Sequence, residues 1–352
     1  MMIPLSAQAL AQGALAELFM PPAFAPQGKI EASQAFRNSS YSYDDPPPDA
    51  RDNDYDSLDS KIDARLYAIK NPLFGVALAG SAESVSPSIS NPLLPDHLSD
   101  INIGLSGYYE LEPFANYGIT ASVSYIEKSD THRGESGQGI QALGLMRIPV
   151  NKEWTLLPGI FYSSLRFGKV SVDVPFPTFS AFWRPSEKLS VIMGVPFAGV
   201  IWDPIDWMKL TAFSFFGVRG SVSLAETVKF DDGPDIIFSQ FFRTLDRSWQ
   251  VRDERSGIGR DAALYQLGYQ VGTGIEVKQQ NESYDWSAKL EVYTTFGEKW
   301  EYRDRDDELI GDPIRNHEGF AARITFSISF GKPSFNRAPD SGAGPPGKGR
   351  AE

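Results

Sequence analysis

Two long runs of alternating residues, joined by a short polar turn, dominate the hydropathy pattern between residues 263 and 297. A period of two predicts β-strands, because successive side chains leave a pleated strand on opposite sides. Each run is more than twice the ~5–6 residues of an average strand, whereas a tilted strand that crosses a bilayer needs about 9–11. The pattern therefore predicts a membrane-spanning hairpin. Its first strand carries Tyr265, Leu267, Tyr269, Val271, Thr273, Ile275 and Val277 on one face and, except for Leu264, polar residues and glycines on the other.

The connections between the other predicted strands alternate between short and long. Short turns are predicted near Asn71, Glu112, Asn151, Pro185, Asp232 and Asn281, and longer loops after Tyr41, Glu83, Glu127, Arg166, Phe197, Leu245 and Gly297. Short periplasmic turns and long external loops are typical of outer-membrane barrels. We predict an all-β, antiparallel up-and-down transmembrane barrel of about 12–14 strands, with both ends on the short-turn side. Fourteen strands result when 208–228 is one strand, and twelve when the first two form a peripheral hairpin.

Composition excludes several classes of protein. No apolar run approaches the ~18 residues of a membrane-spanning helix, so a helical membrane protein is excluded. The absence of cysteine removes disulfides, thiolate metal sites and cysteine nucleophiles. The net charge of −12 argues against a nucleic-acid partner, since phosphates require clustered Lys and Arg.

The two ends of the chain differ from the region between them. The segment from Pro4 to Ala9 resembles the tail end of a secretory signal, and we expect translation to start upstream or Met1 to be a misassigned start. Residues 1–28 are interpreted as a signal-peptide remnant or periplasmic segment, and 29–330 as the barrel. Residues 331–352, rich in Pro, Gly and Ser, are predicted to be a disordered tail.

The last predicted strand ends in an aromatic residue. Ile324, Phe326, Ile328 and Phe330 alternate with Arg323, Thr325, Ser327 and Ser329. This strand resembles the C-terminal assembly signal of bacterial outer-membrane proteins, although those signals usually end the chain. The layout of 29–330 is similar to uncharacterised Gram-negative outer-membrane β-barrel families. The resemblance implies location and architecture, with membrane lipid, lipopolysaccharide and the outer-membrane assembly machinery as expected partners.

Catalytic and metal-binding patterns are weak. His132 and Ser136 resemble the closely spaced His and Ser of outer-membrane phospholipase, but their segment is glycine-rich and loop-like. Asp52, Asp54 and Asp56 begin like a calcium loop, yet Ser57 occupies the position that requires glycine. Gly268, Gly272 and Gly274 lie in a strand with no following helix to hold phosphate, so they indicate bends or close packing. We predict no enzymatic activity, cofactor or metal.

The face opposite the apolar one supplies the candidate site. Its predicted lumen-facing residues are Arg65, Glu110, Arg147, Lys209, Arg219, Gln270, Lys289, Glu291 and Arg323, together with Asp63, Glu276 and Lys278. Both charge signs occur, so these side chains either pair across and fill the lumen or line a water-filled pore. The favoured hypothesis is a narrow pore for small solutes. The alternatives are a non-conducting structural or surface-loop barrel, a lipase-like enzyme in the barrel wall, and a soluble all-β carbohydrate-binding protein. The substrate and oligomeric state are not specified by the sequence.

Overall fold

A computed structural model describes residues 26–42, 54–88, 94–95, 97–112, 117–130, 135–164, 174–215, 219–230, 233–253, 258–281, 283–304 and 308–331. Its strands are β1 (Gly28–Ser42), β2 (Asp54–Lys70), β3 (Phe74–Ser88), β4 (Leu98–Glu112), β5 (Tyr117–Asp130), β6 (Glu135–Pro149), β7 (Trp154–Ser163), β8 (Phe176–Ser186), β9 (Leu189–Val195), β10 (Phe197–Ile205), β11 (Met208–Phe215), β12 (Arg219–Val228), β13 (Asp235–Asp253), β14 (Ile258–Gln280), β15 (Tyr284–Arg303), β16 (Ile314–Asn316) and β17 (Gly319–Phe330). Among these residues no helix is long and apolar enough to span a bilayer.

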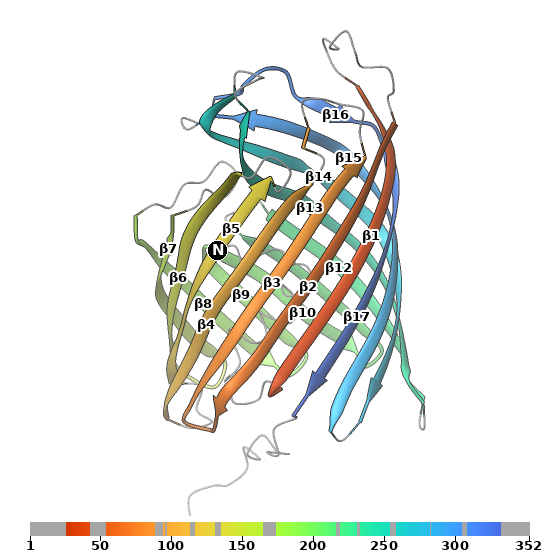
Figure 1. The fold of residues 1–352 in the computed structure, drawn as a ribbon. Helices are drawn as coiled ribbons and strands as arrows, with labels where there is room; N and C mark the ends of the chain where they lie inside the picture. Colours follow the sequence, from red (N-terminus) through yellow and green to blue (C-terminus); the bar gives the residue numbers. More distant parts are fainter. Residues whose placement is uncertain are drawn as a thin grey trace, which may run out of the picture.

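The strands form one closed antiparallel sheet, seen from the side in Figure 1. Closure occurs where β1 pairs with both β2 and β17, so that Gly28 lies opposite Leu66 on one side and Phe330 on the other. In the described chain the wall consists of sixteen strands, because the short β16 only bridges the outer ends of β1 and β15. The predicted fold class, an all-β up-and-down antiparallel barrel, is confirmed.

The strand count of 12–14 is wrong, and the difference lies between residues 197 and 228. The segment expected to be a long loop after Phe197 is β10, and the segment 208–228 expected to be one strand is β11 followed by β12. These two changes raise fourteen strands to the sixteen observed in the described wall. The strands β9 to β12 have only 7–10 residues each, and the connections between them span one to three residues, so they do not stand out in the pattern.

Both described ends of the chain lie at the short-turn end of the barrel, as predicted. The Gln27 amide donates to the Gly331 carbonyl at 2.9 Å, and the Tyr67 amide, near the end of β2, donates to the Gln27 carbonyl. Residues 1–25 and 332–352, which make up most of the proposed leader and tail, lie outside the described part of the chain.

The outward face of the wall is apolar and bounded by aromatic side chains. Near the short-turn end these are Phe74, Tyr109, Trp154, Trp183, Trp202, Tyr284 and Trp286, and at the outer edge they are Phe36, Tyr125, Phe179, Phe242, Tyr269, Phe296 and Phe320. On β15 ten residues separate Trp286 from Phe296, which at a tilt near 40° corresponds to about 25 Å. This height matches the apolar band of outer-membrane barrels.

The apolar band determines where the protein resides. Exposed side chains between the aromatic edges include Leu66, Leu78, Leu105, Val123, Leu290 and Ile324. A soluble protein would leave this large continuous patch in water. The chain is therefore a transmembrane β-barrel, and this architecture places it in the bacterial outer membrane.

Replacing an outward apolar residue with lysine is expected to destabilise the barrel far more than the same change on the inward face. Leu290→Lys near the middle of the band should cost about 2–4 kcal/mol, because the ammonium group would lie in hydrocarbon. Ser327→Lys is the control, since Ser327 faces inward and lies opposite Glu31 in the β1–β17 register. Urea unfolding in lipid vesicles measures both variants. Equal losses would contradict the assignment of the two faces.

Candidate functional site

The outer ends of three strands leave the wall and cross the barrel mouth. In Figure 1, β13, β14 and β15 turn inward at the top of the barrel. In the described wall, β13 and β5 are separated by eight strand positions in either direction, yet the outer end of β13 contacts β4, β5 and β6. We define the septum as residues 245–253, 258–267 and 298–303, which divide the outer part of the lumen.

The bend into the septum coincides with a β-bulge between β14 and β15. Leu267 pairs with Lys299 whereas Tyr269 pairs with Phe296, so β15 carries an extra residue there. Gly297 has a φ of 59°, which glycine adopts without the steric penalty of a side chain. Gly268 packs so closely that a Cβ would lie 2.9 Å from the Cα of Glu298. The glycines therefore permit the bend.

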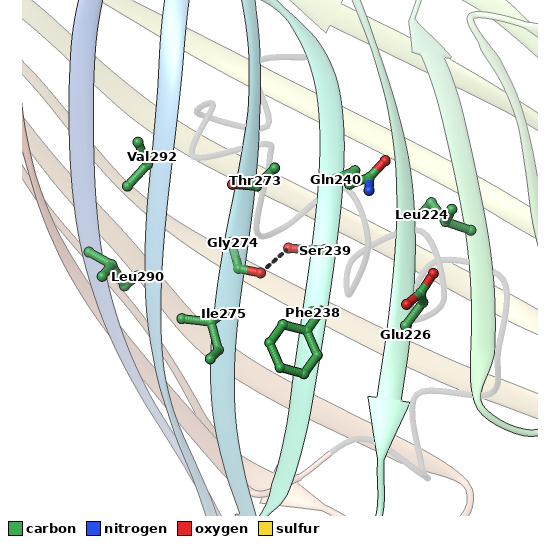
Figure 2. A pocket seen from close by; sticks show the side chains of 10 residues that line it. All are labelled: Leu224, Glu226, Phe238, Ser239, Gln240, Thr273, Gly274, Ile275, Leu290 and Val292. Carbon is green, nitrogen blue, oxygen red and sulfur yellow. Dashed lines mark hydrogen bonds between the residues drawn. The ribbon is translucent and has the colours of Figure 1, made fainter.

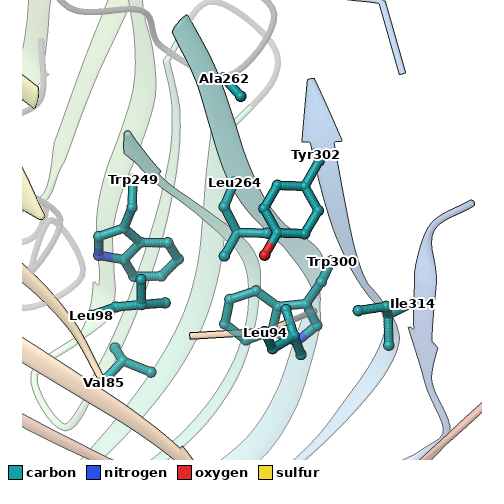
Figure 3. Packing of buried hydrophobic residues seen from close by; sticks show 9 residues of the cluster. All are labelled: Val85, Leu94, Leu98, Trp249, Ala262, Leu264, Trp300, Tyr302 and Ile314. Atoms are coloured by element: carbon teal, nitrogen blue, oxygen red, sulfur yellow. The ribbon is translucent and has the colours of Figure 1, made fainter. Parts of the chain in front are cut away.

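An apolar cluster fixes the septum to the opposite wall (Figure 3). Trp249 of β13 stacks on Trp300 of β15, with ring centroids 5.8 Å apart and planes inclined by 21°. Val85 and Leu98, from β3 and β4, belong to the same cluster and are fully buried. Its other members are Leu94, Ala262, Leu264, Tyr302 and Ile314. Hydrophobic burial thus holds the outer closure in place.

A buried ion network lies beside this cluster. Arg247 of the septum contacts Asp59 at 2.8 Å and Glu83 at 2.5 Å. Arg37 contacts the same Asp59 at 2.5 Å and Glu298 at 3.4 Å. Two arginines and three carboxylates from five strands therefore join the septum to β1, β2 and β3.

The other face of the septum contacts β5 and β12. The ammonium group of Lys128, on β5, donates to the carbonyl of Ser248 at 2.8 Å and lies 3.4 Å from Asp100. Arg219, at the outer end of β12, contacts Asp246 at 2.5 Å. Because both faces of the septum make charged contacts, the outer end of the lumen is occupied by ordered polar and aromatic side chains.

The lumen below the septum has a different lining. Its inward positions include many small residues that are partly exposed, namely Ala79, Gly104, Ser106, Ser122, Ser124, Ser221 and Ser223. Charged side chains between them, such as Lys29 and Glu31, are also partly exposed and pair along one strand at 3.2 Å. Small side chains on nearly opposite walls leave room for water. We refer to this part of the lumen as the vestibule.

The predicted pore-lining residues all occupy inward positions, in separate groups. Arg65 lies on β2, where its guanidinium donates to the Tyr67 hydroxyl at 2.8 Å, and Lys209 lies near the short-turn end of β11. Arg219 belongs to the septum contacts. The others are Glu110 and Arg147, which form one pair, and Gln270, Lys289, Glu291 and Arg323, which lie together on β14, β15 and β17.

The Glu110–Arg147 pair is buried near the short-turn end. Arg147 donates to a carboxylate oxygen of Glu110 and to the hydroxyl of Thr120. Gly118 lies beside the pair, and a Cβ there would be 2.7 Å from Glu110 Oε2 and 2.8 Å from Arg147 Nη2. Glycine therefore makes room for a pair that fills, rather than lines, this part of the interior.

Sequence reasoning missed most of the septum network. Arg247 lies in 246–260, which was predicted to be a charged loop; this prediction is wrong, because β13 continues to Asp253 and β14 begins at Ile258. Asp59 lies an even number of positions from Asp63 and Arg65 along β2, so it shares their inward face. By the same alternation, Arg37 and Arg243 lie on the inward faces of their own strands. Applying the same alternation further along each strand would have assigned these residues to the lumen, but it would not have predicted which of them contact one another.

The described part of the chain has hollows on its outer surface as well. One of about 300 Å³ lies between β12 and β15 and is lined by the outward residues Leu224, Glu226, Phe238, Gln240, Thr273, Ile275, Leu290 and Val292, with Ser239 and Gly274 (Figure 2). Within the wall, the Ser239 hydroxyl of β13 donates to the Gly274 carbonyl of the neighbouring β14 at 3.4 Å. Because the lining faces lipid, this hollow is not a route through the barrel.

The histidine and metal motifs add no site within the described chain. His132 lies outside the described residues, as do Asp52 and the side chain of Ser136. His97 is held by the hydroxyls of Ser84 at 3.2 Å and Ser86 at 2.7 Å. Among the described residues, no His, Asp and Glu side chains group in a way that would hold a metal ion.

Comparisons with known proteins give only distant structural likenesses. No family description and no curated protein matches the sequence. A mutant of the TodX monoaromatic hydrocarbon channel is 9% identical over 90% of this chain and 94% of its own, with a TM-score of 0.38. OccK2 (OpdF) from Pseudomonas aeruginosa is 10% identical over 86% and 99%, with a TM-score of 0.37. A FadL homologue from the same organism is 10% identical over 90% and 93%, with a TM-score of 0.34.

Proposed function

We propose that this protein is an outer-membrane channel for small polar solutes and that the septum closes its outer end. The observation that supports this most is the contrast along the lumen: a vestibule with small, partly exposed side chains lies below a septum built from ends of the wall strands. Barrels of 16–18 strands generally enclose an aqueous channel, whereas eight-stranded barrels are filled by side chains. A barrel of this size that served only as an anchor would not need a lumen lined by small, partly exposed side chains.

The septum also suggests how passage is controlled. It is attached to β1–β5 and β12 by ion pairs, by the hydrogen bond from Lys128 to Ser248 and by one apolar cluster, and it joins the wall through a glycine-containing bulge. Movement about this bulge would separate Trp249 from Val85 and Leu98 without breaking the pairing lower in the wall. The proposed channel is therefore gated by the septum.

A non-conducting barrel is the second candidate, and the buried septum contacts are the observation that favours it. If the apolar cluster never separates, the lumen remains blocked and the function lies at the outer surface. The predicted lipase-like and carbohydrate-binding alternatives have no supporting group among the described side chains.

Planar-bilayer recordings of the purified protein distinguish these two candidates. For a gated channel we expect a low basal conductance with discrete openings to larger levels, because the septum must move before ions can pass. Liposome swelling with sugars of increasing size then measures the width of the open route. A protein that inserts correctly but never opens, even at high voltage, would refute the channel and support the non-conducting barrel.

A further inference from the structure

Three cationic side chains converge on one carboxylate in the wall of the vestibule. Lys289 Nζ lies 2.7 Å from Glu291 Oε1, and Arg243 Nη1 lies 3.2 Å from Glu291 Oε2. Arg323 Nη1 lies 3.6 Å from that same Oε2 atom. These residues come from β13, β15 and β17, so the group exists only because the sheet places these strands in this order.

Aromatic rings hold the two guanidinium groups in position. The Arg243 guanidinium lies over the rings of Phe241 and Tyr293, at 4.4 Å and 5.1 Å from their centroids. Arg323 lies 5.5 Å from the Tyr293 ring, and one of its donors is 3.5 Å from the Tyr293 hydroxyl. Gln270 accepts from Arg243 Nε at 2.7 Å. The cations are thus fixed by stacking and hydrogen bonding as well as by charge.

Two glycines explain how the cluster fits against the wall. A Cβ at Gly272 would lie 2.4 Å from the Cβ of Tyr293, so the absence of a side chain allows Tyr293 to lie across β14. A Cβ at Gly274 would lie 3.1 Å from Lys289 and 3.3 Å from Glu291. The interpretation of these glycines as sites of close packing is confirmed.

The cluster carries more positive charge than its own carboxylate can balance. Three cations surround Glu291, and Glu276 lies opposite Lys289 in the β14–β15 register. The next inward residue of β14, Lys278, lies opposite the carboxylate of Asp235. Four cations and three carboxylates therefore leave a surplus of one positive charge. Arg243 is 94% buried, and its Nη2 has no hydrogen-bond partner among the described residues. A buried guanidinium donor ordinarily has an acceptor. The side chains of Lys289 and Arg323 remain 27% and 17% exposed, so a solute in the vestibule could reach them.

We propose that Arg243, Lys289 and Arg323 form a binding site for the carboxylate group of a small organic anion in the vestibule. This inference rests on the proposed channel function, because it names the class of solute that the channel would select. A carboxylate would supply the acceptor oxygens that the surplus donors lack, and guanidinium groups suit such a planar acceptor.

Calorimetric titration of the purified barrel in detergent tests the site with two probes of similar shape and opposite charge, benzoate and benzylammonium. We expect benzoate to bind and benzylammonium not to bind. Arg243→Gln combined with Arg323→Gln should weaken benzoate binding by about tenfold or more, since two charged donors are lost. Lys188→Gln is the control, because Lys188 is exposed in a short turn, pairs with the exposed Asp206 and lies outside the lumen, so this change should leave the affinity unchanged.

Glu291→Gln provides a second test, in which the variant is expected to bind benzoate more tightly. Unfolding of the variant could not produce that result. Removing the internal carboxylate frees donors and raises the local charge, so benzoate should bind several-fold more tightly. Cold-SDS gel mobility verifies that each variant is folded. Absence of benzoate binding, or the same affinity in all folded variants, would overturn the site even if the channel conducts. Benzoate binding with the expected changes in a barrel that never conducts would instead support the site and refute the channel.

Discussion

Deleting residues 247–266 is expected to open the barrel permanently. The two flanking residues, Asp246 and Leu267, are already paired, so an Asn-Gly turn can join them and close a shorter hairpin. The deletion removes Arg247, Trp249 and Leu264, and with them much of the apolar cluster and the ion network. Conductance in planar bilayers should rise about tenfold or more, towards that of open barrels with 16–18 strands.

Lys188→Ala is a suitable control for this deletion. Lys188 lies in a short turn at the opposite end of the barrel and pairs only with the exposed Asp206 in the described structure. The conductance of the Lys188→Ala variant should equal that of the unchanged protein. If the deleted barrel is folded by cold-SDS gel mobility but conducts no better than the control, the septum is not the barrier to ion flow.

Asp59→Ala is expected to cause the largest loss of stability by a single substitution in the described ion network. Asp59 is the shared partner of Arg37 and Arg247, and all three side chains are at least 87% buried. Removing the shared carboxylate leaves two cations close together with reduced compensation. Breaking a buried ion pair typically costs about 3–5 kcal/mol. Urea unfolding in lipid vesicles measures the change in the free energy of unfolding.

The same variant has a second expected effect. If repulsion between Arg37 and Arg247 is relieved by displacement of the septum, channel openings should become more frequent while part of the stability loss is recovered. Asp206→Ala is the control, since its partner Lys188 is exposed and neither measurement should change. Unaltered stability in Asp59→Ala would show that the septum is not held by this network.

Much of the barrel could be predicted from local pattern. The alternation in 263–297 identifies β14 and β15, because lipid on one side and water on the other require opposite polarity at neighbouring positions. The positions of the short turns place both chain ends on one side. In contrast, short strands such as β10, β11 and β12 carry few repeats each, so their boundaries and the final count were not recoverable from the pattern.

The candidate site could be predicted only in part. Parity placed Gln270, Lys289, Glu291 and Arg323 on the inward face, but the partner that completes their group, Arg243, was overlooked. Predicting that Glu110 pairs with Arg147 would have required the register of β4, β5 and β6. Alternation assigns a side chain to a face, whereas register assigns it a neighbour.

The sequence by itself determined a membrane-spanning barrel with an apolar outer face, a polar inner face and its chain ends at the short turns. Those properties follow from residue periodicity, which is local. Only the tertiary structure decided that the wall has sixteen strands in the described chain and that 245–253 and 258–267 fold across the lumen. The reason is physical: a strand in the wall and a strand crossing the mouth have the same period. Their difference lies in contacts such as Arg247 with Asp59 and Lys128 with Ser248, between residues more than 100 positions apart.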